Sequence, residues 1–470
     1  MKVQVLSHAC LLVESGGSSI VIDPWLLGSC YWRSWWNFPA AQFDAEALAR
    51  VDAVLISHIH WDHWHGPTLK KLFKGKPIYV PDEPGLRSAK DLATIGFKAV
   101  HRVPHGQTVQ IGKLAVTMYQ FGLFLNDAAI VVEAEGVGLL NANDAKIAGW
   151  ALRHIVARHG RFKFALRSHS SANPRVSFVR EDVENYVGDD REHYFRAFAA
   201  FMDCVQPEYA IPFASNHCHL HDDVYGMNGV ISNPLQLRAF VAERHEPRDW
   251  ALQVMLPGSQ WTSDRGFELR SEDCFNDLGG TLAAYRAQIA PTLDAYRNQE
   301  NAVQVSNDHY LRFAEMLGGW PRPLSGSLRV SVQWPDGRGE TMQIDLRTRS
   351  VRQVDYTQRS EPGLPLIIFP AIVFRDSVLK NMFHHAGISK RCRFLARSAK
   401  DLQRLRAVMS VLEKRELGFL PIEPGYLGRL AKAYVRRWRE LFVYAHALWL
   451  VKIRRKPLYL AEEAILRGEL

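Results

Sequence analysis

The sequence predicts an α/β sandwich followed by a mostly helical α+β region. Up to about residue 260, short apolar strand-like runs alternate with helical stretches, as a layered α/β domain requires. Beyond that point the pattern changes to helix over about 275–315 and then to a hairpin over 328–346 with a Gly-rich turn. Helix is expected again over 377–412 and 429–456.

We therefore expect two domains. The first covers residues 1–265 and holds the functional site. The second covers residues 266–470, and it would cover the substrate, form an oligomer contact or touch a membrane surface. A chain of 470 residues, 47% of them hydrophobic, can bury cores of this size.

Cysteine usage limits the chemistry. The six cysteines are scattered, with no C-x-x-C or C-x-H spacing. Iron–sulfur clusters need close thiolate or imidazole pairs, so no internal cluster is expected. The scatter also gives no disulfide framework, and the amino-terminal residues alternate like a first strand rather than a secretory signal. These features predict a cytoplasmic protein.

The most informative segment, residues 58–63, reads H-I-H-W-D-H and directly follows an apolar strand-like run. Its imidazole and carboxylate groups suit zinc, iron or manganese. In an extended segment His58 and His60 lie on the same side and can reach one ion. A tighter turn would direct Asp62 and His63 to a second ion. The segment therefore predicts a site for two divalent transition metals.

Other ligands must come from distant segments, because six residues cannot complete the coordination of two ions. Apolar strand-like runs end in acids at Asp23 and at Asp144. Farther on, His217, His219 and His221 occupy alternate positions, followed by paired acids. At least one of these three histidines is expected to bind metal, although a solvated polar loop is the alternative.

The segment at 58–63 resembles the HxHxDH signature of the metallo-β-lactamase superfamily, which implies an αββα sandwich. Together with residues 141–144 and 206–214, it resembles the metallo-β-lactamase-type portion of CMP-N-acetylneuraminic acid hydroxylases and their bacterial relatives. The likeness covers roughly residues 1–265. It implies iron-dependent hydroxylation with O2, in a group whose members also carry a Rieske iron–sulfur segment.

The resemblance also implies roles for single residues. Asp144 falls where the superfamily has its metal-bridging aspartate. Asp62 and Asp144 are the two candidate catalytic acids. Asp23 corresponds to an acid that holds a ligand imidazole by its other ring nitrogen. His8 corresponds to a histidine near the site that does not always bind metal, and a buried, hydrogen-bonded role is favoured for it.

The chain departs from this family at two places. The family has a histidine in the segment that matches 120–127, which contains none here, and His169 is the candidate for the missing donor. The family has an acid where this chain has His219, whereas His221 corresponds best to its last histidine. The sequence leaves open which of His169, His217, His219 and His221 are ligands.

Two classes of function remain. In the favoured one, two irons activate O2 to hydroxylate or N-oxygenate a small polar or anionic substrate. Electrons would then come from a separate donor such as a ferredoxin or a Rieske protein. In the alternative, zinc or manganese lowers the pKa of a bound water, and the hydroxide cleaves an ester, amide or phosphodiester. A relative that only binds its ligand is a third, weaker option.

Aromatic residues gather after the Asp23 turn, on a loop expected at the active face. We expect Trp32, Trp35 and Trp36 to line the substrate pocket, with simple packing against the second domain as the equal alternative.

The formal net charge of +9 is concentrated near the carboxyl end. Basic residues there flank an apolar run over 441–451, which is far shorter than the roughly 20 residues that span a bilayer. A packed helix with a solvated basic face is favoured. Weak contact with a membrane surface is the alternative, and no nucleic-acid partner is expected.

Overall fold

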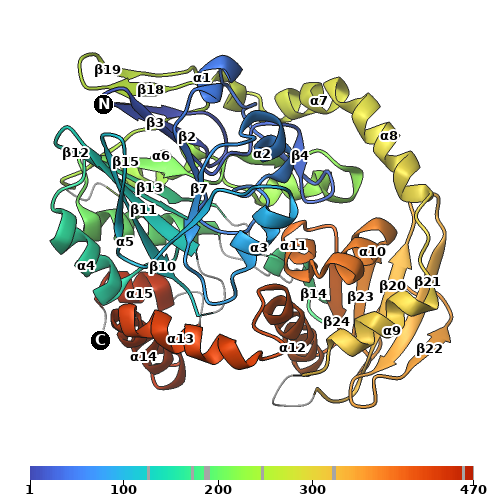
Figure 1. Cartoon of the computed structure of the whole chain (residues 1–470). Coiled ribbons are helices and arrows are strands. Elements are labelled where there is room, and N and C mark those ends of the chain that lie inside the picture. The colour runs from blue at the N-terminus through green and yellow to red at the C-terminus, as the bar shows by residue number, and fades with distance from the viewer. Residues whose placement is uncertain are drawn as a thin grey trace.

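The computed structural model describes residues 1–123, 127–170, 174–184, 191–244, 248–319, 324–457 and 461–468. In the first part of the chain two β-sheets pack face to face, and helices cover the outer face of each (Figure 1). This arrangement confirms the predicted αββα sandwich.

The first sheet follows the order β19 (Gly266–Glu268), β18 (Gln260–Thr262), β1 (Lys2–Val5), β2 (Leu11–Ser15), β3 (Ser18–Ile22), β6 (Ala53–Leu55), β7 (Ile78–Pro81), β8 (Val100–Val103). The second sheet follows the order β17 (Ala251–Leu252), β15 (Tyr209–Phe213), β13 (Phe164–Ser168), β12 (Val137–Asn143), β11 (Asp127–Ala134), β10 (Leu114–Phe121), β9 (Thr108–Ile111).

The apolar core of the sandwich lies between these sheets, where side chains such as Val5, Ile22 and Met118 are fully buried. The outer face of the first sheet is covered by α1 (Ala45–Ala49), α2 (Gly66–Leu72) and α3 (Arg87–Thr94). The outer face of the second sheet is covered by α4 (Gly149–His159), α5 (Arg191–Val205) and α6 (Pro234–Glu243).

Strand direction places the functional loops. β3 runs parallel to β6, and β12, β13 and β15 run parallel in the second sheet. Loops that follow the carboxyl ends of parallel strands emerge at the same edge of a sheet. The segments after these five strands therefore meet at one mouth of the sandwich.

A third, mixed sheet dominates the second half of the chain. Its order is β14 (Phe178–Arg180), β24 (Arg393–Ala396), β23 (Leu366–Pro370), β20 (Ser327–Gln333), β21 (Gly339–Asp345), β22 (Val351–Val354). The predicted hairpin is confirmed as β20 and β21, which pair antiparallel. Packed with this sheet are α9 (Asn307–Met316), α10 (Ala371–Lys380), α11 (Phe383–Ile388) and α12 (Ala399–Glu416).

The prediction of helix over 377–412 is wrong at β24. This strand lies between β14 and β23, and Phe394, Leu395 and Ala396 are all buried. A short run buried on both faces carries no helical periodicity, so periodicity alone does not distinguish it from a buried turn of helix.

The sandwich and the third sheet are linked by smaller elements. These are β4 (Ser29–Cys30), β5 (Trp35–Asn37), β16 (His217–His219), η1 (Pro174–Ser177), η2 (Asp222–Val230), η3 (Asp273–Phe275), α7 (Leu278–Gln288) and α8 (Ala290–Asn301). β16, β5 and β4 form a three-stranded sheet, which joins the aromatic loop to the histidine-rich segment.

The last helices return to the sandwich. They are α13 (Pro424–Arg436), α14 (Trp438–Lys452) and α15 (Ala461–Leu466), and Figure 1 shows them beneath α4 and α5. Val443, Leu450 and Ile465 join the core on the outer face of the second sheet. The exposed residues of α14 itself are mostly apolar, whereas the exposed cations of this region flank the helix at both ends.

The domain boundary at residue 265 stays a prediction. Several segments cross it: β19 extends the first sheet, β14 joins the third sheet, and α14 and α15 pack on the sandwich. Within the described residues, no helix is long and apolar enough to pass through a membrane.

Stability should depend on the contact between the two sheets at Phe164. Its fully buried ring lies 5.0 Å from Trp261, 5.9 Å from Tyr209 and 6.1 Å from Phe267, between ring centroids. Phe164→Ala should lower the free energy of unfolding by about 3–5 kcal/mol in a urea titration, because it leaves a cavity. Phe164→Leu, which fills most of the space, should cost less than about 1.5 kcal/mol. Equal, small losses for both variants would contradict this packing.

Candidate metal centre

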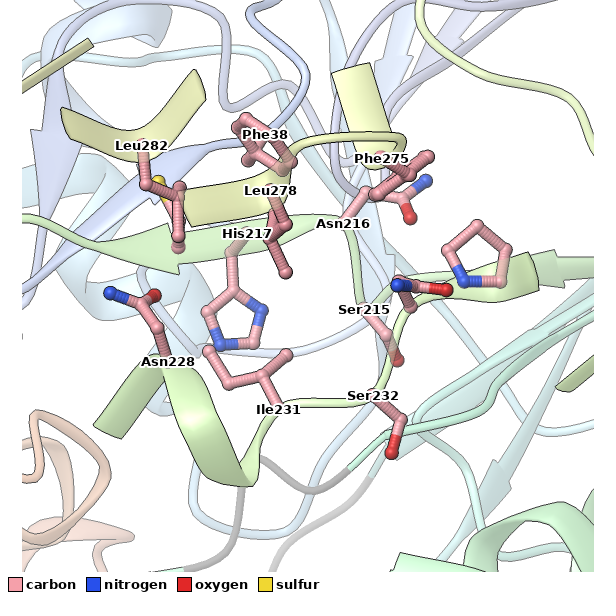
Figure 2. A pocket seen from close by; sticks show the side chains of 13 residues that line it. Phe38, Ser215, Asn216, His217, Asn228, Ile231, Ser232, Phe275, Leu278 and Leu282 are labelled. Atoms are coloured by element: carbon pink, nitrogen blue, oxygen red, sulfur yellow. The ribbon is translucent and has the colours of Figure 1, made fainter. Parts of the chain in front are cut away.

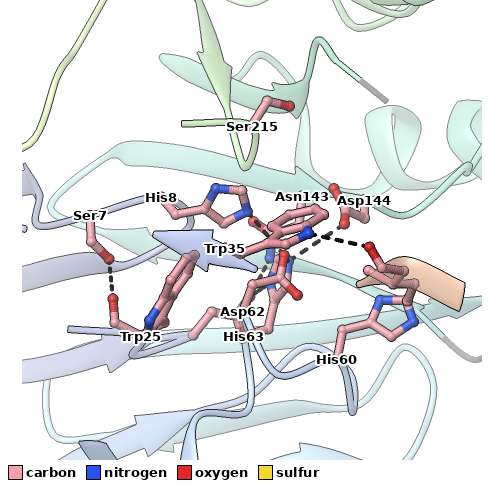
Figure 3. Close-up of polar contacts among 12 residues, drawn as sticks. Ser7, His8, Trp25, Trp35, His60, Asp62, His63, Asn143, Asp144 and Ser215 are labelled. Atoms are coloured by element: carbon pink, nitrogen blue, oxygen red, sulfur yellow. Dashed lines mark hydrogen bonds and ion pairs between the residues drawn. The ribbon is translucent and has the colours of Figure 1, made fainter. Parts of the chain in front are cut away.

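The predicted ligands follow the carboxyl ends of strands. Residues 58–63 follow β6, Asp144 follows β12, and His169 follows β13. His8 comes after β1 and lies opposite them in the same mouth. Figure 3 shows His8, Asp62, His63 and Asp144 converging there.

Backbone strain marks the same edge. Asp23, Asn143 and Ala214 end three of the strands with φ of 49°, 47° and 49°. A residue other than glycine in this region costs about 1 kcal/mol or more, so the conformation persists only where the surroundings hold it.

Hydrogen bonds to the Asp23 carboxylate stabilise the strained conformation at this edge. The carboxylate is fully buried and accepts hydrogen bonds from Ser57 N (2.7 Å), Ser57 Oγ (2.6 Å) and Asn143 Nδ2 (2.7 Å). His63 Nδ1 lies 2.8 Å from the same carboxylate. Nδ1 therefore carries the ring proton, which leaves His63 Nε2 free for a metal. Asp23 thus holds the His63 imidazole by the nitrogen opposite Nε2.

One group of potential ligands consists of His8, Asp62 and His63. Asp62 Oδ2 lies 3.0 Å from His8 Nε2 and 3.5 Å from His63 Nε2, and the Tyr31 hydroxyl donates to the other carboxylate oxygen. His8 was expected to support the site from outside. The structure instead places its ring among the atoms that could hold an ion.

A second group consists of His58, His60 and Asp144. His58 Nε2 lies 2.7 Å from His60 Nδ1. Asp144 Oδ2 also lies 3.5 Å from His63 Nε2 of the first group. The Asp144 carboxylate thus borders both groups, as a bridging acid must.

Proton placement tests whether this second group fits a metal. His58 Nδ1 lies 2.9 Å from Ser57 Oγ, whose proton goes to Asp23, so Nδ1 donates and Nε2 keeps a lone pair. If the far nitrogen of His60 donates outward, its Nδ1 keeps a lone pair as well. Two lone pairs 2.7 Å apart repel, and a cation between them removes the conflict. The donor set fits a metal ion.

Electrostatics agree with neutral imidazoles in the second group. Burial, helped by the neighbouring His63, lowers the pKa of His58 to about 4. Burial also opposes a charge on His63, but the carboxylates of Asp62 and Asp23 outweigh it and raise its pKa well above the usual value. A divalent cation would replace the proton that these carboxylates attract.

Asp127 is a site residue that the sequence analysis missed. It begins β11, and its Oδ1 lies 4.0 Å from His58 Nε2. Burial and the nearby Asp144 raise its pKa to about 8. The resemblance led us to look for a histidine in the segment 120–127, and the structure places a carboxylate of this segment beside His58 instead. A search restricted to imidazoles could not find it.

Three other predicted histidines are buried near these groups, but they belong to neither. His217 stacks on Trp35, with ring centroids 3.6 Å apart, and its centroid lies 5.4 Å from that of His8. Figure 2 shows His217 lining a small cavity of about 30 Å³, enough for a water molecule. His219 Nδ1 lies 3.2 Å from the Ser34 carbonyl, whereas His169 is fully buried after β13.

The prediction that His221 is a ligand is not supported. Its Nδ1 accepts from Asp223 N at the start of η2, and its Nε2 lies 3.3 Å from the Glu300 carboxylate. Arg391 bridges Asp223 and Glu300 in the same cluster. His221 therefore caps a helix within a buried ionic cluster, a role that donor spacing cannot reveal.

The aromatic loop divides between packing and a cavity. Trp32 lines a cavity of about 750 Å³. Trp35 is fully buried against His217, and Trp36 faces a different hollow beside Tyr285, so neither lines that cavity. Its other walls are completed by aromatic and basic side chains: Tyr31, Trp61, Trp64, Arg33, Lys70, Arg87 and Lys380.

The second half of the chain contributes His384, which the sequence analysis also missed. It lies on α11, and its Nε2 is 2.7 Å from His60 Nε2. The two rings stack with centroids 4.9 Å apart, and His384 Nδ1 lies 3.5 Å from Glu413. Nothing in the spacing along the sequence connects residues 60 and 384.

Residues 2–123 match the family profile described as "Beta-lactamase superfamily domain". The αββα fold and the HxHxDH segment agree with this match, so this part of the chain has the features of a metallo-β-lactamase superfamily domain.

Among curated proteins, the chain is 28% identical over 261 residues to the cytidine monophosphate-N-acetylneuraminic acid hydroxylase of Mus musculus. That match covers 53% of this chain and 45% of the mouse protein. The Xenopus laevis protein of the same name is 34% identical over 230 residues, covering 47% of this chain and 39% of its own. The matches thus span less than half of these relatives.

A solved structure of CmlA, a diiron β-hydroxylase from Streptomyces venezuelae, is 17% identical with a TM-score of 0.39. That comparison covers 55% of this chain and 53% of CmlA. An isothiocyanate hydrolase from Delia radicum gut bacteria is 16% identical with a TM-score of 0.41, over 56% of this chain and 98% of its own. Likeness at this level has no bearing on the chemistry.

The Asp23 network yields a first test of the centre. Asp23→Asn would place an amide donor opposite the Ser57, Asn143 and His63 donors. The free energy of unfolding should fall by about 3 kcal/mol, because buried donors lose their acceptor. Chemical denaturation measures this, with Asp264→Asn on an exposed loop as the control. An unchanged unfolding midpoint for Asp23→Asn would be incompatible with the network.

The contact between His384 and His60 yields a second test. His384→Ala should weaken the binding of one of the two metals by about 10–100-fold. The expected reason is that His60, a candidate ligand through Nδ1, loses the hydrogen-bond partner of its Nε2. Competition with a chelator measures the affinity. His384→Gln, which keeps an acceptor, should recover part of the loss, and His154→Ala on α4 should have no effect. Equal affinities for all four proteins would exclude this role.

Proposed function

We propose that the chain is a dinuclear-iron enzyme that uses O2 to hydroxylate or N-oxygenate a small polar or anionic substrate. The donor composition carries the proposal. Each of the two groups combines two imidazoles with one carboxylate, and this set with open positions is typical of non-haem iron enzymes that use oxygen. Relatives named as hydroxylases support the same direction.

Each of the two groups of potential ligands would hold one iron. His58, His60 and Asp144 would hold one iron, and His8, Asp62 and His63 the other. The irons, when bound, supply the activation of O2. Asp62 is kept in place by the Tyr31 hydroxyl, which donates to it from the wall of the large cavity.

The cavity supports a substrate with a flat or anionic part. Its aromatic walls offer stacking surfaces, and it is bordered by four cations. Two of these cations are balanced, because Arg87 pairs with Asp91 at 2.7 Å and Lys380 with Asp376 at 3.7 Å. Arg33 and Lys70 are left to attract an anionic group.

Electrons would arrive from another protein. The six cysteines show no C-x-x-C or C-x-H spacing, so we expect no iron–sulfur cluster within these 470 residues. A ferredoxin or a Rieske protein is the proposed donor. Location in the cytoplasm stays a prediction from cysteine usage.

A metal-dependent hydrolase is the second candidate. Two imidazoles and a carboxylate also hold catalytic zinc, which leaves a position for water and lowers its pKa towards neutrality. The same cavity would then receive an ester, an amide or a phosphodiester.

Metal analysis of anaerobically purified protein separates the two candidates. We expect about two irons per chain and O2 uptake on addition of a reductant, because each group suits ferrous iron. Asp62→Ala should lose one iron and the O2 uptake, whereas His221→Ala should keep both irons, since His221 lies in the ionic cluster with Glu300. Zinc as the native metal, with no O2 uptake after iron loading, would favour the hydrolase. Two irons retained in Asp62→Ala would refute the site.

A further inference from the structure

Helix α14 exposes an apolar stripe. Trp438, Leu441, Phe442, Leu448 and Trp449 are 36–60% exposed. Their spacing of three, four and seven residues places them on one face of the helix. An apolar face turned to solvent is the reverse of the usual pattern for a surface helix.

The stripe continues onto α4 as a connected aromatic surface. Phe442 stacks on Trp150 with ring centroids 4.8 Å apart, and Trp438 meets Phe442 edge-on at 5.9 Å. Trp150 and Phe442 are each 49% exposed. Exposed aromatic side chains that contact one another indicate an interaction site more often than scattered exposed aromatic side chains do.

The opposite face of α14 is held in place. Val443 and Leu450 lie in the core against the second sheet. Arg437 and Glu440 form a buried ion pair that also binds the backbone of Gly122. The helix therefore cannot rotate to bury the stripe.

Positive charge surrounds the stripe. Residues 424–457 contain nine lysines and arginines and a single acid, Glu440, which is buried and paired. The exposed cations stand at both ends of α14: Arg436 before it, Lys452 at its end, and Arg454 and Arg455 after it. Arg439 and Arg454 lie over the rings of Trp438 and Trp449.

We propose that α14 docks this protein onto the surface of a membrane that contains anionic lipid. The 15 residues of α14 extend about 22 Å, too short to cross a bilayer. An apolar face that carries tryptophan and phenylalanine, with flanking arginine and lysine, is the arrangement of helices that lie in the lipid interface. The apolar stripe enters the acyl boundary while the cations meet lipid phosphates.

Charge favours lipid over a second copy of this chain. A symmetric dimer through the stripe would bring the same cationic ends of α14 together from both subunits. These ends carry no acid that could pair across the contact. An anionic lipid surface provides the missing negative charge. The inference is independent of the metal centre.

Sedimentation of the full chain with vesicles tests the proposal. Vesicles of phosphatidylcholine mixed with phosphatidylserine should pellet the protein, and vesicles of phosphatidylcholine alone should pellet about tenfold less. The double substitution Phe442→Ser and Leu448→Ser should reduce binding to the mixed vesicles by about tenfold or more, as should Lys452→Glu with Arg455→Glu.

The control is Leu311→Ser on α9, which is 41% exposed and should bind as the unaltered protein does. Melting temperatures should fall by no more than a few degrees in all variants, because the altered side chains lie at the surface and only the contacts of Phe442 with Trp150 and Trp438 are lost. Binding that is absent, or equal in all variants, would overturn the proposal. So would a dimer in size-exclusion chromatography that Phe442→Ser and Leu448→Ser dissociate, since the stripe would then be a subunit contact.

Discussion

The candidate metal centre depends on one buried carboxylate. Asp23 leaves β3 in a left-handed conformation and accepts hydrogen bonds from the segment after β6 and from the end of β12. Three strand ends from two sheets are thereby fixed to one another. Through His63 the same carboxylate also decides which ring nitrogen faces the metal. Asp23 thus supports both the fold and the site. The hydrogen bonds that its carboxylate accepts replace those that water would make, which is why a buried carboxylate is tolerated there.

The second half of the chain takes part in the site. α11 brings His384 against His60, while His385 pairs with the buried Glu416 and lies 3.2 Å from the carbonyl of Ile59. The third sheet and its helices thus hold part of the metal-binding segment in place. Their contribution reaches His60 Nε2, the nitrogen that His60 would turn away from a metal bound at Nδ1. Contacts at that nitrogen set the orientation of a histidine ligand.

The sequence predicted what is local and missed what depends on tertiary contacts. Residues 58–63 were identifiable because one short segment carries four donors after a buried strand. Asp127 was overlooked because only an imidazole was sought in its segment, and His384 because its partner is 324 residues away. Alternating spacing suggested His221 as a metal ligand, yet its ring instead contacts Glu300 in a nearby ionic cluster. The apolar run over 441–451 does form a helix, α14. Which of its apolar residues are buried and which stay exposed depends on tertiary packing, which the sequence does not reveal.

Anomalous diffraction at the iron edge, from crystals grown without oxygen, tests the central claim most directly. Two peaks are expected at the mouth of the sandwich. One should lie within bonding distance of His58, His60 and Asp144, and the other within bonding distance of His8, Asp62 and His63. A single peak, or none between these side chains, would contradict a dinuclear iron centre.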